Sequence, residues 1–143
     1  MPTPELCFTT ATHLAHLLRT RSLSARELMQ ATLDRIAEVN PELNAIVTLV
    51  PEKALAWAAE ADERQARGEA LGPLHGLPIA HKDLVMTAGI RSTAGSKLLA
   101  GFVPQQDDLI VTRLRAAGAI TVGKTNGSRS PTRLFCGRPL CAL

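Results

Sequence analysis

The stretch that decides the fold is GPLHGLPIAHKDL, at residues 72–84. Its first five residues have the glycine and proline content of a loop, and residues 77–80 form an apolar run that predicts a strand. Three polar residues, His81, Lys82 and Asp83, follow that run directly. Because ligands of α/β proteins bind beyond the carboxyl ends of strands, the stretch predicts a candidate site as well as a strand.

Two helices are predicted at the N-terminal end of the chain. Leucines at helical spacing predict the first over residues 10–19. A capping-box pattern beginning at Ser24 opens the second, which we expect to run to Val39 and to stop at Asn40-Pro41.

The segments between these helices and residues 72–84 alternate again between strand and helix. The β-branched run at residues 45–49 predicts a short buried strand. Pro51 then opens an alanine-rich helix, for which Gly68 is the expected C-terminal stop.

The chain after residue 84 predicts one more helix and one more strand. Residues 86–107 are rich in Gly, Thr and Ser and predict irregular structure, with one helical turn near residues 96–100. Asp107 or Asp108 is a candidate cap for a helix that ends at Gly118 and leads into a strand at residues 119–122. This order of elements predicts an α/β fold, with helices packed on a mixed or parallel sheet.

Composition and charge exclude several classes of protein. The net charge of +3 arises in residues 127–143, which hold three arginines and no acid, while residues 1–126 balance 13 basic against 13 acidic residues. A neutral body with four aromatic residues predicts no direct binding of nucleic acid. Without an apolar run of membrane-spanning length or a signal-like N-terminus, we expect a cytoplasmic protein that is not bound to a membrane.

Residues 118–125 satisfy the phosphate-loop pattern G-x-x-x-x-G-K-[ST]. That motif requires a strand before its first glycine and a helix after its lysine. Here a helix is predicted before Gly118, and Asn126-Gly127 stands where a helix should begin. The context therefore argues against nucleotide binding.

Lys82 is the main candidate for chemistry. A lysine that follows the apolar run at residues 77–80 is expected to be largely buried, where desolvation lowers its pKa and leaves a neutral amine able to act as a general base. The alternative is an ion pair with Asp83 or another carboxylate, which would keep Lys82 charged, and the residues alone favour this structural role.

Other chemically active residues give weaker signals. His75 and His81 have no cysteine or carboxylate at metal-ligand spacing, so we predict neither a metal nor a cofactor. The hydroxyls of Ser92, Thr93 and Ser96 lie in a glycine-rich segment, where such residues are usually turn formers.

Residues 8–126 resemble the N-terminal part of the amidase-signature family. The segment at 72–84 resembles the family's catalytic-lysine segment, and blocks at 93–97, 100–104, 113–119 and 123–126 follow in the family's order. The resemblance implies an amidase-signature fold and hydrolysis of small carboxamides, and one branch of the family provides the glutaminase subunit of tRNA-dependent amidotransferases.

The implied mechanism uses a Ser-Ser-Lys triad, in which Lys82 is the only member that this chain matches. The lysine takes a proton through a bridging serine while a second serine attacks the amide carbon. Backbone amides of a Gly/Ser-rich loop stabilise the oxyanion.

The tail at residues 127–143 departs from the family pattern, because Arg, Pro and Cys become frequent and acids vanish. Ser128 and Ser130 lack the flanking glycines of the family and do not transfer to the triad. We therefore expect 1–126 to be the N-terminal part of a truncated amidase-signature domain, followed by an aberrant, disordered tail of the kind that a frameshift produces. An inactive amidase relative is the first hypothesis, and a small non-catalytic interaction or regulatory module is the alternative. Neither the amide substrate nor the oligomeric state follows from the sequence.

Overall fold

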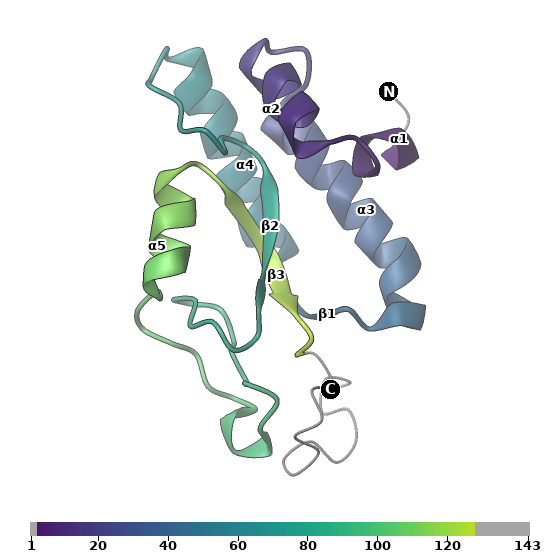
Figure 1. The fold of residues 1–143 in the computed structure, drawn as a ribbon, viewed down its shortest axis with the longest axis vertical. Coiled ribbons are helices and arrows are strands. Elements are labelled where there is room, and N and C mark those ends of the chain that lie inside the picture. The colour runs from purple at the N-terminus through teal and green to yellow at the C-terminus, as the bar shows by residue number, and fades with distance from the viewer. Residues whose placement is uncertain (1–2, 128–143) are drawn as a thin grey trace.

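The computed structural model describes residues 3–127 (Figure 1). In chain order the elements are α1 (Thr3–Cys7), α2 (Ala11–Arg19), α3 (Ala25–Leu43), β1 (Ile46–Leu49), α4 (Pro51–Ala66), β2 (Pro78–Lys82), the 3-10 helix η1 (Lys97–Leu99), α5 (Leu109–Ala116) and β3 (Ile120–Thr125). This order confirms the predicted alternation. Of the predicted tail at residues 127–143, all but the first residue lies outside the described residues.

The strands form a mixed sheet in the order β1-β3-β2. β3 is the central strand, antiparallel to β1 and parallel to β2. In Figure 1, α3 and α4 run along one side of the strands, and α5 lies beside the β2–β3 pair, away from α3. Helices packed on a mixed sheet are the architecture that the sequence predicts.

An aliphatic core joins the helices to the sheet. Leu28 and Met29 of α3 and Ala54 and Ala58 of α4 are almost completely buried and pack in one cluster with Val122 of β3. Small alanines on α4 let this helix approach its neighbours closely. With three phenylalanines and one tryptophan in the whole chain, aliphatic packing carries most of the burial.

Helix α3 does not stop at Asn40-Pro41 as predicted but continues to Leu43. Pro41 lacks only its own N–H donor, and a proline in the last turn leaves most of the helical hydrogen bonds intact. Asn44, in the left-handed conformation with φ 47°, ends the helix by donating its N–H to the Asn40 carbonyl. The Asn40 side chain meanwhile exchanges hydrogen bonds with the backbone of Ile46, which fixes the start of β1.

Strand β1 was predicted to be buried, and that prediction is wrong. Its first three residues are half-buried, and Leu49 is 38% exposed. Within the described residues β1 lies at an edge of the sheet, so it is covered less well than β3.

The predicted helix boundaries are otherwise close to those observed. The capping box joins Ser24 to Glu27 through backbone and side chain, and Gly68 adopts a positive φ of 74° just after α4. Asp108 takes the N-cap position of α5 without capping it, because its carboxylate accepts the N–H of Met86 at 2.8 Å instead.

Candidate active site

Lys82 lies at the carboxyl end of β2, paired with Thr125 at the end of the parallel strand β3. This is the predicted position along the strand, but its side chain is exposed, so the prediction of burial is wrong. Side chains alternate between the two faces of a strand, and the buried neighbours His81 and Asp83 both take the other face. Among residues 3–127, the Lys82 side chain makes neither a hydrogen bond nor an ion pair.

Asp83 is 3% exposed and holds the loop that follows β2. Its carboxylate accepts the Thr93 N–H at 3.0 Å and also the Thr93 hydroxyl. Its own N–H donates to the carbonyl of Thr125 at the end of β3. These contacts leave Lys82 without Asp83 as an ion-pair partner.

A second lysine, Lys124, is the buried one. It is 0% exposed in the centre of the sheet. Its ammonium group donates to the carbonyl of Val85, to Thr87 Oγ1 at 3.1 Å and to Ser92 Oγ at 2.8 Å. These three neutral oxygens match the three donors of an ammonium group, so the side chain is fully satisfied.

Burial sets the electrostatics of Lys124. Desolvation lowers the pKa of its ammonium group, while the carboxylates of Asp83 and Asp108 act in the opposite direction and favour the charged form. Lys124 was not among the candidates predicted from the sequence. The available signal was a lysine inside the β-branched run of a strand, where a charged side chain requires partners.

A family model described as Amidase matches residues 27–141, which is most of the chain. This chain belongs to the amidase family. Solved amidase-signature enzymes share its fold: peptide amidase from Stenotrophomonas maltophilia superposes with a TM-score of 0.78 at 41% identity, over 82% of this chain and 24% of that one.

This chain also matches only part of the length of each curated relative. A glutamyl-tRNA(Gln) amidotransferase subunit of Thiobacillus denitrificans is 48% identical over 141 residues, which cover 94% of this chain and 28% of the relative. The protein of the same name from Azoarcus sp. is 54% identical over 113 residues, covering 79% of this chain and 23% of the relative. The chain thus spans about a quarter of the length of the relatives it matches.

The three candidate hydroxyl residues of this amidase-family chain, Ser92, Thr93 and Ser96, make no hydrogen bond to Lys82. Ser92 is buried and accepts from Lys124, and the Thr93 hydroxyl donates to Asp83. Ser96 precedes η1 and makes no capping hydrogen bond there. Ser92 and Thr93 therefore have structural partners, as expected for hydroxyls of a glycine-rich segment.

Most of the segment that matches the phosphate-loop sequence pattern forms strand β3, rather than a loop that leads into a helix. Gly123 lies where β3 meets β1, and a Cβ at this position would come within 2.3 Å of the Thr48 carbonyl oxygen. The following Lys124 is buried among protein oxygens. The glycine and lysine of the pattern therefore serve strand packing.

The two histidines predicted to be outside any metal site are both buried and lie in different surroundings. His81 Nε2 is 3.1 Å from Thr121 Oγ1, and burial, followed by the charge of Lys124, lowers its pKa. Burial also lowers the pKa of His75, assisted by the charge of Arg64. Residues 3–127 contain no group of three His, Cys, Asp or Glu side chains arranged to hold a metal ion.

In the part of the chain from residue 3 to 127, no helix combines the length and apolar character that crossing a membrane requires.

Proposed function

We propose that this chain is the N-terminal, lysine-bearing part of a carboxamide hydrolase, and that Lys82 is its proton-transfer residue. The observation that carries the proposal is the position of Lys82 at the carboxyl end of β2, in a chain that belongs to the amidase family. An exposed lysine at that end of the sheet is open to contact with a neighbouring hydroxyl.

In the proposed reaction Lys82 acts through two serines that residues 3–127 do not bring to it. A serine oxygen attacks the carboxamide carbon, and its proton passes through the bridging serine to the Lys82 amine. Lys82 returns this proton through the same serine to the amide nitrogen, so the C–N bond breaks and ammonia leaves as the acyl-serine forms. Water then attacks the acyl-serine and releases the carboxylate. The relatives are named as tRNA amidotransferase subunits, and the resemblance implies a glutaminase in that branch of the family, so the side-chain amide of glutamine is the first substrate to test.

We further propose that the 143-residue chain by itself is inactive. A general base has to give up its proton and to lie within hydrogen-bond reach of the group that it activates. The described residues surround Lys82 with neither burial nor a hydroxyl partner. Asp83, Thr93 and Ser92 are committed to contacts of their own.

A chimera tests the hydrolase proposal. Residues 1–126 would replace the matching part of the Thiobacillus denitrificans relative, and glutamine hydrolysis would be followed by ammonia release. We expect turnover that falls at least 1,000-fold in Lys82→Met and stays unchanged in Lys53→Met, a substitution of an exposed lysine on α4. A folded chimera that works equally well with Lys82→Met would refute the role of Lys82.

The inactivity proposal is tested on the chain alone. Purified protein should release ammonia from glutamine or simple carboxamides no faster than its Lys82→Ala variant. Turnover that depends on Lys82 would overturn this proposal and would show that a nucleophile lies elsewhere in the chain.

A further inference from the structure

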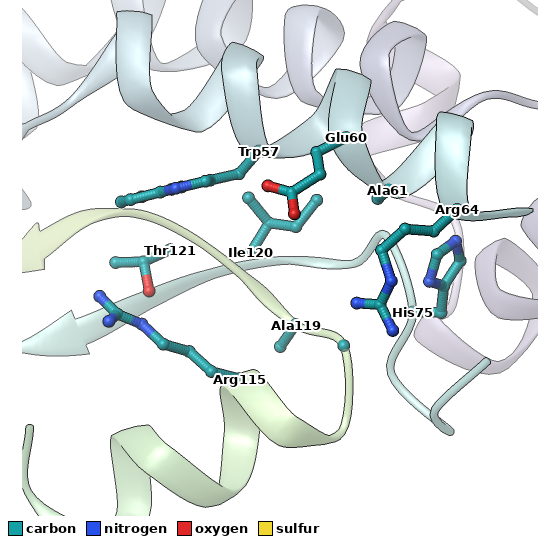
Figure 2. A pocket seen from close by; sticks show the side chains of 10 residues that line it. Trp57, Glu60, Ala61, Arg64, His75, Arg115, Ala119, Ile120 and Thr121 are labelled. Carbon is teal, nitrogen blue, oxygen red and sulfur yellow. The ribbon is translucent and has the colours of Figure 1, made fainter. Parts of the chain in front are cut away.

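A cleft of about 250 Å³ opens between α4, α5 and the start of β3 (Figure 2). Trp57 and Arg64 of α4 line one wall, and Arg115 of α5 lines the opposite wall. Ile120 forms part of the apolar floor, and His75 closes one end from the loop before β2.

Two residues that line the cleft carry a buried side-chain nitrogen without a partner, His75 Nε2 and Arg115 Nη2. Within residues 3–127 they are the only buried side-chain nitrogen or oxygen atoms without a hydrogen bond. His75 is only 5% exposed. Leaving such a group unpaired is unfavourable, so the occurrence of both in the lining of one cleft indicates an occupant that supplies hydrogen-bond partners.

The free atom of Arg115 restricts the chemistry of that occupant. Arg115 Nη1 already pairs with Asp107 at 2.7 Å, and the guanidinium lies over the Trp57 ring at 5.6 Å from its centroid. Its Nη2 can only donate, so the occupant has to present an acceptor oxygen. Across the cleft Arg64 Nε is paired with Glu69 at 2.9 Å, and its guanidinium adds a second positive group to the lining.

Glu60 is the acidic residue of the lining, and it is exposed. Arg115 and Arg64 are each already paired with a carboxylate, Asp107 and Glu69, so the unsatisfied Nη2 donor of Arg115, rather than an excess of positive charge, selects the occupant. Trp57, Ala61 and Ile120 supply an apolar surface beside these donors.

We propose that this cleft binds the carboxylate of a small organic acid, whose short apolar body lies against Trp57 and Ile120. A guanidinium group is the side chain best matched to a carboxylate, and charge-assisted hydrogen bonds are about twice as strong as neutral ones. A volume of about 250 Å³ equals that of roughly eight liquid water molecules, which is ample for an acid of about four carbons.

The carboxylate site is separate from Lys82. Ile120, at the start of β3, lines the cleft, whereas Lys82 pairs with Thr125 at the end of that strand. Five residues of strand put roughly 16 Å between the two positions. The proposal therefore depends neither on amide hydrolysis nor on the two serines of the triad.

Trp57 is the single tryptophan of the chain and provides a direct readout. We would titrate the 143-residue protein with butyrate and, in parallel, with butyramide, which has the same shape without the charge. Butyrate should change Trp57 emission saturably and bind at least tenfold more tightly than butyramide. Arg115→Lys, which keeps a positive charge but removes the Nη2 donor, should weaken butyrate binding at least tenfold.

Arg113→Lys is the matched control, since Arg113 is an exposed arginine of the same helix outside the cleft. It should bind butyrate as the parent does. Equal responses to butyrate and butyramide, or a linear response without saturation, would overturn the proposal and leave a cleft filled with water only.

A second measurement uses the parent protein and does not depend on the folding of a variant. The ring-nitrogen NMR signals of His75 should shift during the butyrate titration with the same midpoint as Trp57 emission. Signals of His75 that do not move while Trp57 responds would place butyrate elsewhere and refute the site.

Discussion

Lys124 Nζ donates a hydrogen bond of 2.8 Å to Ser92 Oγ, and this contact joins the central strand β3 to the loop that follows Lys82. The same ammonium group also contacts Val85 and Thr87, which lie earlier in that loop. A single buried side chain thus fixes the loop against the sheet at three points. The position of the chain just beyond Lys82 depends on it.

Lys124→Met should destabilise the fold by roughly 2–4 kcal/mol, because it leaves the buried hydroxyls of Thr87 and Ser92 without this donor. Urea unfolding followed by circular dichroism measures the change. Lys53→Met is the control, since Lys53 donates to the carbonyl of Gly89 in the same loop from an exposed position. Its cost should stay under about 1 kcal/mol, and equal costs for the two variants would contradict the role of burial.

Asp83→Asn should loosen residues 84–93 without unfolding the sheet. The amide that replaces the carboxylate has one acceptor oxygen in place of two and loses the charge that strengthens both contacts with Thr93. Faster hydrogen exchange at the Thr93 amide, by at least tenfold, is the expected result. In Asp34→Asn, which alters an exposed carboxylate on α3, the exchange rate of the Thr93 amide should not change.

Gly123→Ala should separate β1 from β3. Its Cβ would lie 2.3 Å from the Thr48 carbonyl oxygen, and a backbone atom cannot move aside without breaking the strand pairing. We expect a loss of about 1–3 kcal/mol in stability, with loss of protection at the Val50 amide, which donates to Val122. Gly101→Ala adds a methyl group in open space, so it should leave stability within about 0.5 kcal/mol of the parent.

Lowering the pH below the ordinary pKa of histidine should destabilise the fold. Burial lowers the pKa values of His75 and His81 in the folded chain, so the unfolded chain binds protons first as the pH falls from about 6.5. The free energy of unfolding therefore decreases from that point down through the folded pKa values. His81→Gln should reduce this slope, whereas His13→Gln, on the exposed face of α2, should not.

Local sequence signals predicted most of the fold. The capping box at Ser24, the left-handed glycine after α4 and the apolar run before Lys82 each specify structure within a few residues, and the structure confirms all three. The end of α3 was misplaced because Asn44 closes the helix after the proline, which requires a hydrogen bond back to Asn40.

The candidate site was predicted less completely, because burial depends on neighbours distant in the sequence. Lys82 and Lys124 both end or interrupt apolar runs, and the sequence alone favoured the burial of Lys82. The structure gives the reverse, since Lys124 lies under residues 85–92, whereas Lys82 takes the face of β2 opposite to that of its buried neighbour His81. Which lysine is covered follows from the face of the sheet against which the loop after β2 packs, and the path of that loop was not predicted.

The central place of β3 in the sheet also has a consequence during synthesis on the ribosome. In the sheet of residues 3–127, β1 and β2 have no hydrogen bonds to each other, and each pairs only with β3, the last described strand to be made. At about 5–20 residues per second, roughly 4–15 s pass between the completion of β1 and that of β3. For this interval the nascent chain holds helices and unpaired strands, so a chaperone that recognises extended apolar segments would have its longest access to residues 46–49.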